Sequence, residues 1–401
     1  MSDQKGLLSG FNILDLTHYV SGPYASLLMA SQGANVIKIE RPVVGDYSRH
    51  IGPYPDNIKN IEKSGLFLYL NTSKKSITVN LKHESGKEIF KHLVEWSDVL
   101  IENFAPRVMP SLQLSYDELL AINPELIMTS ISNFGQSGPY RNYSAREINL
   151  YAIGGLMYIT GDPDREPLQM GARLSQYGAG QNAFVATLSA LWHRENSGEG
   201  QYVDVAISEY IATILENALS MYSYTGASIG RSGNRGYGRA AWGPYRAKDG
   251  YVGVIAGPDR KWEAMADLME IPGLADSRFK DRSGRTTHAD EIDKLMKPWL
   301  VKRGKKEIFE KAQGLGLAFA YVATPQDILE WEHLGEREFF VKVQHPVAGD
   351  FQYSSGPYKI SEFPWQLDPA PTLGQHNQAI LCDLLGYSTA DLLRMKDEGV
   401  V

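Results

Sequence analysis

The stretch FNILDLTHYVSGPYASLLMASQGANVIKIE, residues 11–40, decides the fold class of this chain. Its apolar run Phe11–Leu16 predicts a buried strand, and Pro23–Gln32 predicts a helix. A second apolar run, Asn35–Glu40, predicts another buried strand. Two strands joined by a helix form a βαβ unit, whose strands run parallel. These residues therefore predict an α/β fold with a parallel sheet.

The turn between the first strand and its helix bears on dinucleotide binding. It contains only Ser21, Gly22 and Pro23 and lacks the spacing G-x-G-x-x-G. Glu40 stands where a ribose-binding acid would be placed, but the glycine fingerprint that should accompany it is missing. The sequence therefore disfavours a dinucleotide site.

Further strands follow along the chain. Asp98–Glu102 and Glu125–Ser132 each follow a helical stretch, and Tyr202–Ile207 predicts one more strand. Glu209–Tyr224 then predicts a helix. Strands that alternate with helices indicate a doubly wound, Rossmann-like domain.

A glycine-rich segment, Gly171–Gln201, precedes the strand at residue 202. We predict a loop that contains Gly178 and Gly180 and leads into a helix over Ala179–Arg194. Glycines before a helix allow backbone N–H groups to approach a ligand. No Asp, Glu, Cys or Lys occurs between Pro167 and Arg194, so the polar side chains of this loop are few.

The middle of the chain predicts a second, smaller domain. Asp249-Gly250 separates two strand-like runs within Trp242–Ala256 and predicts a hairpin. Lys261–Gln313 follows with a helical pattern. The polar, glycine-rich stretch Ser228–Arg239 predicts a mobile flap. A further helix is predicted over Asn377–Leu385.

Composition limits the possible partners. Net charge is −7 and the sequence pI is about 5.8, which argues against nucleic acid or an anionic membrane as the main partner. The 401 residues contain one cysteine, Cys382, as expected in a reducing cytosol. No apolar run approaches the roughly 20 residues of a membrane span. We expect a cytoplasmic protein without a metal site.

Six separated motifs occur in one order along the chain. They are LDLTHYVSGPYASLLMASQGANVIKIERPVVGD (14–46), LNTSKKSITVNLK (70–82), SDVLIENFAP (97–106), NPELIMTSISNFGQSGPY (123–140), HRENSGEGQYVDVAISE (193–209) and APTLGQHNQAIL (370–381). Together they resemble the family III CoA-transferases, which include formyl-CoA and carnitine CoA-transferases. The resemblance implies a Rossmann-like large domain built from both chain ends, here 1–215 and 335–401, and a smaller α+β middle domain, here 225–330. It also implies two interlinked subunits.

The resemblance further implies coenzyme A and acyl-CoA as substrates. In this family an Asp carboxylate attacks an acyl-CoA thioester and forms a mixed anhydride and a CoA thiolate. The thiolate returns to give an aspartyl-CoA thioester, from which an acceptor acid takes CoA. Such a nucleophile divides one difficult step into easier ones.

Carried over by motif, the CoA-contacting positions fall in the turn after the first strand, after the second strand, and within the motifs at 70–82 and 97–106. They are Tyr19, Val20, Arg41, Val79, Asn80, Lys82, Asn103, Phe104 and Ala105. Arg41 and Lys82 suit the nucleotide phosphates. Ser111 replaces a basic residue found in many relatives, and Arg107 is the candidate to compensate for it. Glu147 matches a glutamate near the acyl group.

The main departure from the family pattern is Gln176, which occupies the place of the nucleophilic aspartate within GARLSQYGAG. The interpretation we favour is a subunit without the nucleophile in a heteromeric CoA-transferase. Its related partner subunit would carry the aspartate, the donor would be an acyl-CoA such as succinyl-CoA, and benzylsuccinate is one candidate acceptor.

Three other interpretations stay open. The first is a homomeric transferase that uses Glu147 or Tyr177 as its nucleophile. The second is an acyl-CoA racemase, although Arg146-Glu147 stands where racemases have a His-Asp pair and arginine is a poor base. The third is a non-catalytic protein that binds acyl-CoA.

Overall fold

The structure is a computed structural model that describes residues 6–235 and 239–401. The chain divides into two compact units. The first contains the residues up to Leu156, Met170–Glu216 and Gly335–Val401, and the second contains Met157–Gln169 and Asn217–Leu334. Met157–Gln169 thus groups with the middle of the chain, which the predicted boundaries did not anticipate.

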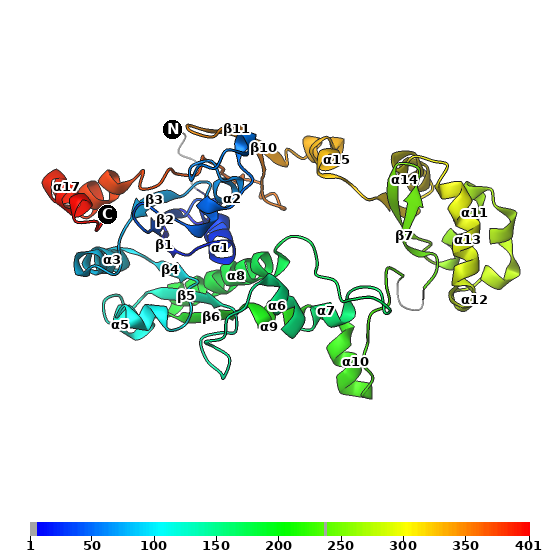
Figure 1. Cartoon of the computed structure of the whole chain (residues 1–401), viewed down its shortest axis with the longest axis horizontal. Coiled ribbons are helices and arrows are strands. Elements are labelled where there is room, and N and C mark those ends of the chain that lie inside the picture. The colour runs from blue at the N-terminus through cyan, green and yellow to red at the C-terminus, as the bar shows by residue number, and fades with distance from the viewer. Residues whose placement is uncertain (1–5, 236–238) are drawn as a thin grey trace. The chain divides into compact units, whose positions relative to one another are not determined.

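A parallel sheet of six strands organises the first unit (Figure 1). Its order is β3-β2-β1-β4-β5-β6, the order of doubly wound dinucleotide-binding folds. The strands are β1 (Asn12–Leu16), β2 (Asn35–Glu40), β3 (Lys75–Thr78), β4 (Val99–Glu102), β5 (Ile127–Ser132) and β6 (Tyr202–Ala206). The α/β fold class is confirmed, and β3 is a strand that the sequence analysis did not identify.

Both faces of this sheet are buried, because side chains alternate along each strand. On one face Ile13 of β1 packs with α1 (Ser21–Ala30) and α8 (Leu174–Ser197). On the other face Leu14 packs with α3 (Glu84–Trp96) and with the C-terminal helices η5 (Gln378–Leu384) and α17 (Thr389–Asp397). The sheet therefore lies between two layers of helices.

Helix α8 begins earlier than the sequence indicated. It starts at Leu174, so Gly178 and Gly180 lie inside the helix and not in a loop before it. A Cβ atom at Gly178 would overlap the Tyr210 ring, and one at Gly180 would overlap the backbone of Ser21. These glycines serve close helix packing, and the loop prediction for them is wrong.

The helix predicted over Glu209–Tyr224 is interrupted. The structure has α9 (Ile207–Thr213) and α10 (Asn217–Thr225), separated at Glu216, whose φ is 53°. A left-handed residue cannot continue a right-handed helix. Glu216 also ends the first unit at this point.

The second unit has its own sheet and core. The predicted hairpin is confirmed as β7 (Trp242–Ala247) and β8 (Gly250–Ile255), and β9 (Ala318–Tyr321) completes an antiparallel sheet. Helices pack on it around a core that includes Trp262, Phe279 and Met296. They are α11 (Asp259–Met269), η3 (Pro272–Ala275), η4 (Ser277–Phe279), α12 (Arg282–Thr287), α13 (Ala289–Leu300) and α14 (Lys305–Gly314).

The remaining elements are short. They are η1 (Tyr47–His50), η2 (Pro55–Asn57), α2 (Gly65–Leu70), α4 (Val108–Ser111), α5 (Tyr116–Leu120), α6 (Glu147–Ile153), α7 (Leu156–Ile159), α15 (Pro325–Leu329), α16 (Glu332–Glu336) and the hairpin of β10 (Phe340–His345) and β11 (Gly349–Ser354). The predicted flap Ser228–Arg239 is described except for residues 236–238, which lie outside the described residues; its described part contains no helix or strand.

Candidate functional site

A cavity of about 800 Å³ opens in the first unit. Its lining includes Leu16, Glu40 and Phe104, which lie at or just after the C-terminal ends of β1, β2 and β4. In open α/β sheets, ligands bind beyond these ends, where the strand order reverses. Here the reversal falls between β1 and β4, so the cavity occupies the expected place for a ligand.

Five of the positions expected to contact CoA line this cavity together. They are Arg41, Val79, Asn80, Lys82 and Phe104. They are distant in sequence, but parallel strands bring their C-terminal ends to one edge of the sheet.

The remaining positions lie beside the cavity rather than on its wall. Asn103 accepts a hydrogen bond from the N–H of His18 over 2.8 Å and donates one to the His18 carbonyl over 2.7 Å. His18 itself lines the cavity. Asn103 thereby joins the ends of β1 and β4. Val20 is buried, and Ala105 is exposed.

The basic side chains at the cavity are Arg41 and Lys82, both of them solvent-exposed. Ser111 also lines the cavity, whereas Arg107 does not. The expectation that Arg107 compensates for Ser111 therefore has no support in the cavity wall.

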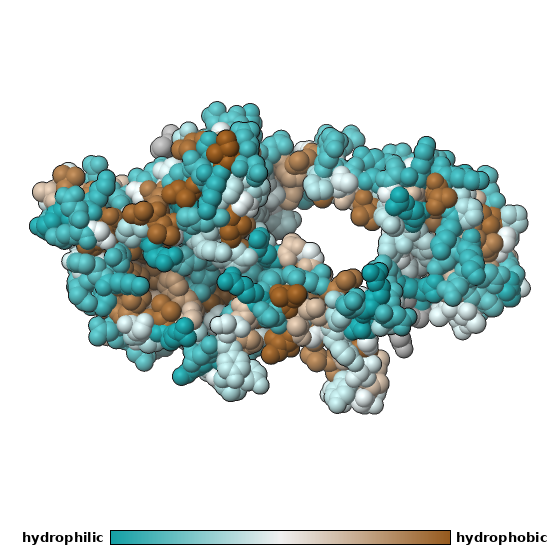
Figure 2. Space-filling model, viewed as in Figure 1, coloured by the Kyte–Doolittle hydropathy of each residue, from teal (hydrophilic) through white to brown (hydrophobic). Residues whose placement is uncertain are grey.

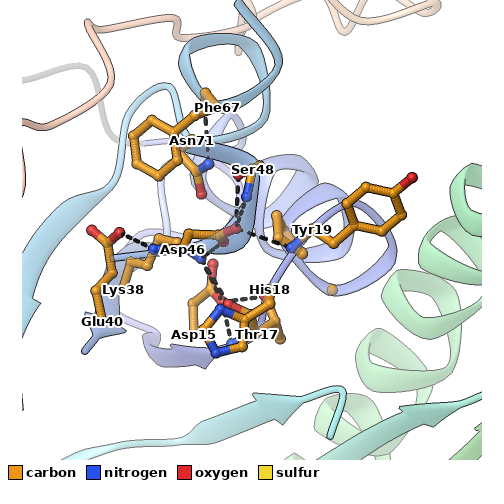
Figure 3. Close-up of polar contacts among 12 residues, drawn as sticks. Asp15, Thr17, His18, Tyr19, Lys38, Glu40, Asp46, Ser48, Phe67 and Asn71 are labelled. Carbon is orange, nitrogen blue, oxygen red and sulfur yellow. Dashed lines mark hydrogen bonds and ion pairs between the residues drawn. The ribbon is translucent and has the colours of Figure 1, made fainter. Parts of the chain in front are cut away.

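Buried charges lie beneath the turn that follows β1 (Figure 3). Asp46 accepts hydrogen bonds from the N–H groups of Tyr19 and Ser48, over 3.1 and 2.7 Å. Its second oxygen lies 2.8 Å from the ammonium of Lys38. Lys38 also donates to the Thr17 carbonyl over 3.0 Å. The ion pair of Asp46 and Lys38 thus holds the turn on both sides, at the Tyr19 N–H and at the Thr17 carbonyl.

A second ion pair extends this cluster. Lys74 lies 2.9 Å from Asp15, and Lys38 lies 3.6 Å from the other oxygen of Asp15. Burial opposes the charge of Asp46, yet the neighbouring Lys38 holds its pKa at about 2. Burial lowers the pKa of Lys74 to about 8 despite its contact with Asp15. The cluster is a rigid, charged support for the turn.

Glu40 is not available to a ribose. Its carboxylate receives two hydrogen bonds from the guanidinium of Arg49, over 2.7 and 2.9 Å, and another from the N–H of Asp46 over 2.9 Å. Ser76 donates a further one over 2.7 Å. These contacts give the Glu40 carboxylate a structural role that requires no bound dinucleotide.

Gln176 lies in the first turn of α8 and is 8% exposed. Glu147, the first residue of α6, accepts hydrogen bonds from the N–H and hydroxyl groups of Ser175, over 3.0 and 2.6 Å. The structure therefore brings the two predicted catalytic positions together. Both oxygens of Glu147 are engaged in holding the start of α8.

Tyr19 connects the two parts of the site. Its hydroxyl accepts a hydrogen bond from Arg173, whose guanidinium also lies 5.2 Å from the Tyr19 ring centre. Arg173 precedes the first residue of α8. The turn beside the cavity and the helix that carries Gln176 are thus in direct contact.

The C-terminal residues also shape the cavity. The N–H of Asn80 donates to the Val400 carbonyl over 2.8 Å, and Gly399 lines the wall. Val400 is fully buried in the core on this side of the sheet.

Several lining residues were missed by the sequence analysis. They include His18, Val44, Gly399 and Val43, whose side chain is 86% exposed. The signal for the two valines was their position in the motif ERPVVGD, directly after a predicted strand of a parallel sheet, where ligands bind. His18 and Gly399 had no such signal.

Metal and membrane features were also sought in residues 6–235 and 239–401. No group of three or more His, Cys, Asp or Glu side chains there is arranged to hold a metal ion. None of the described helices combines the length and hydrophobicity required to cross a membrane.

Comparison with known proteins gives consistent matches across the chain. The model of CoA-transferase family III matches residues 8–377. Formyl-CoA:oxalate CoA-transferase of Streptomyces avermitilis is 34% identical over 98% of this chain and 99% of its own. Succinyl-CoA:(R)-benzylsuccinate CoA-transferase subunit BbsE of Thauera aromatica is 31% identical over 96% of this chain and 97% of its own.

A solved structure shows the same architecture. The CAIB/BAIF family protein from Brucella suis is 29% identical and superposes with a TM-score of 0.87, covering 95% of this chain and 100% of its own. Family model, relatives and architecture agree with the order of motifs in the sequence. The chain belongs to CoA-transferase family III.

Proposed function

We propose that this chain is the subunit of a heteromeric CoA-transferase that binds an acyl-CoA but lacks the nucleophile. A related subunit would supply the catalytic aspartate. The donor would be an acyl-CoA such as succinyl-CoA, and the acceptor a carboxylic acid, with (R)-benzylsuccinate as a candidate. The 31% identity to a subunit of such an enzyme from Thauera aromatica supports this choice.

The 800 Å³ cavity supports binding of CoA by this chain. This volume lies within the range of small-molecule sites, about 300–1,000 Å³. Arg41 and Lys82 offer cations to phosphates, and Val43 and Val44 offer an apolar surface to a purine ring. The wall thus combines the two kinds of contact that a nucleotide end requires.

The observation that supports a missing nucleophile in this chain is Gln176, which lies at the start of α8. A neutral amide has no anionic oxygen with which to form an anhydride. No carboxylate occurs between Pro167 and Arg194 to replace it.

Two substitute nucleophiles are disfavoured by their surroundings. Each oxygen of Glu147 accepts a hydrogen bond from Ser175, which makes either oxygen a weaker nucleophile. Burial raises the pKa of Tyr177 to about 12, so a phenolate is scarce at neutral pH. These properties favour a nucleophile supplied by another chain.

Exposed apolar surface supports a partner subunit. Figure 2 shows apolar side chains on the surface where α6 and α9 lie in Figure 1, and Ile148 and Ile153 of α6 are exposed. Trp192 on α8 is 75% exposed. No residue of α10 is buried, although it carries Leu219 and Tyr224. Apolar surface of this kind is typical of subunit interfaces.

In the proposed reaction the partner's aspartate oxygen bonds to the thioester carbon of succinyl-CoA, and the C–S bond breaks. The released CoA thiolate then attacks the aspartyl carbonyl of the anhydride, so succinate leaves and an aspartyl-CoA thioester remains. The acceptor carboxylate attacks this thioester, the C–S bond breaks, and a second anhydride and the CoA thiolate form. The thiolate then attacks the acceptor carbonyl of this anhydride, so the acceptor leaves as its CoA thioester. The aspartate is regenerated.

The test compares this chain alone with this chain and its aspartate-bearing partner. After incubation with succinyl-CoA, hydroxylamine should modify an aspartate of the partner and no residue of this chain. Gln176→Ala should leave most of the turnover of the complex intact, because the amide is not the nucleophile.

The opposite result would reject the heteromer. If the purified single chain transfers CoA and Gln176→Ala lowers its rate by orders of magnitude, the amide takes part in catalysis and no partner is needed. If the chain binds acyl-CoA but neither form transfers CoA, the non-catalytic interpretation replaces ours.

A further inference from the structure

A second cavity, of about 270 Å³, lies wholly within the second unit. Arg239, Arg282 and Arg285 line it together with Trp242. Small residues, Ala240–Ala241 and Ala256–Pro258, form the rest of the wall, and none of the described acidic residues lines it. The cavity therefore has a basic wall with an apolar flank, and of its three arginines Arg285 is paired with Asp259.

Arg285 is held rigidly at this wall and is 2% exposed. One guanidinium nitrogen donates to the carbonyls of Phe279 and Lys280 over 3.1 Å each, and another donates to Asp259 over 2.7 Å. Its Nε is buried without a hydrogen-bond partner. Arg285 therefore contributes a fixed positive charge to the wall, while its Nε is buried away from solvent.

Two further features add to the attraction for an anion. The guanidinium of Arg239 stacks over the Trp242 ring, 4.2 Å from its centre, which leaves the edge of the guanidinium to hydrogen-bond. Helix α11 begins at Asp259, directly after the lining residues Gly257 and Pro258. The positive end of its dipole is thus close to the cavity.

We propose that this cavity binds a small carboxylate anion. Guanidinium groups match the planar geometry of a carboxylate. The indole ring and the alanines suit a short carbon chain beside it, which a bare phosphate does not have. The cavity is smaller than the roughly 300–1,000 Å³ typical of sites for larger ligands, and it shares no residue with the cavity assigned to CoA.

This inference does not rest on the proposed heteromer, and the test uses the full chain with succinate as the probe. Isothermal titration should give saturable binding of one succinate. The double variant Arg239→Gln, Arg282→Gln should weaken it about tenfold or more, because both exposed cations are lost. The matched control is Arg278→Gln, an exposed arginine of the same unit that pairs with Asp276 and Glu291 and does not line the cavity.

Four results would overturn the proposal. The first three are the absence of saturable succinate binding, unchanged binding in a correctly folded double variant, and tighter binding of inorganic phosphate than of succinate. Loss of succinate binding in Arg41→Ala would move the site to the first unit and would also reject it. CoA titrated in parallel tests the other cavity, so failure of one site is distinguishable from failure of the other.

Discussion

The carboxylate of Asp46 accepts a hydrogen bond from the backbone N–H of Tyr19, and Tyr19 holds a φ of 74°. An aromatic residue rarely adopts this left-handed conformation, which costs roughly 1–3 kcal/mol. The surroundings must therefore hold the turn in place. Asp46 does so together with Lys38, which binds the Thr17 carbonyl on the other side of the turn.

Asp46→Asn should destabilise the protein and weaken its binding of CoA. Removing one partner of a buried ion pair costs about 3–5 kcal/mol, because the Lys38 ammonium would remain buried beside a neutral amide. Urea unfolding and CoA titration measure the two effects. The control Asp350→Asn breaks an exposed pair with Lys342 and should cost about 1 kcal/mol or less. Equal effects of both variants would refute a special role for Asp46.

Arg41→Ala and Lys82→Ala should each weaken CoA binding by about 1–3 kcal/mol, the range for a charge-assisted hydrogen bond. Calorimetry with CoA measures this loss. Arg107→Ala is the control. Arg107 is exposed and is close in sequence to the lining residue Phe104, but it does not line the cavity itself. Unchanged CoA affinity in both test variants would rule out this phosphate site.

Glu102→Gln should alter the dependence of stability on pH. Burial raises the pKa of Glu102 to about 7, so between its ordinary value of 4.5 and pH 7 the folded chain binds more protons than the unfolded one. Stability therefore falls as pH rises through this window. The amide of the variant still accepts the hydrogen bond of the Phe104 N–H, but it does not titrate. The decrease in the free energy of unfolding between pH 4.5 and 7 should therefore be smaller by about 3 kcal/mol in the variant.

Urea unfolding at pH 5, 6, 7 and 8 measures that difference. Glu95→Gln, at an exposed position of α3, serves as its control and should retain the pH dependence of the native chain. Parallel stability curves for Glu102→Gln and the native chain would contradict the prediction.

Glu147→Ala should loosen the first turn of α8. Ser175 would lose the acceptor for its N–H and hydroxyl groups, and losing a cap of this kind costs about 0.5–2 kcal/mol. Hydrogen exchange at the start of α8 should speed up, while exchange in β1 stays slow. Exchange rates at α8 that match the native chain would show that Glu147 does not hold the helix.

Deleting residues 399–401 should weaken CoA binding and lower stability together. Val400 is buried in the core, and its carbonyl accepts the N–H of Asn80 beside the cavity. Losing a buried aliphatic side chain costs about 2–5 kcal/mol. Leu393→Ala removes an exposed side chain of α17 and should change neither property. A deletion variant with native CoA affinity would contradict this role.

Much of the large domain was predictable, because β1, β2, β4 and β5 are apolar runs with helices between them. β3 was missed because its four residues, KSIT, are short and mostly polar. The start of α8 was misplaced because Gly178 suggested a loop, whereas its role is to admit the Tyr210 ring.

The site was predictable where it follows from topology. Arg41 and Phe104 come after two strands that the sequence predicts, and a parallel sheet brings such positions together. Val79 was placed by its motif alone, because β3 was missed. The buried charges were not predictable, because Lys38 and Asp15 belong to residue types that usually face water. Their burial depends on pairing across segments, which no single stretch of sequence displays.

The cavity takes wall residues from Leu16 and from Gly399, near opposite ends of the chain. During synthesis the ribosome releases β1 and β2 long before the residues that join Asn80. Until the residues near Val400 are made, the wall of the cavity beside Asn80 is incomplete. Ligand binding at this cavity should thus depend both on residues that are synthesised early and on residues that are synthesised much later.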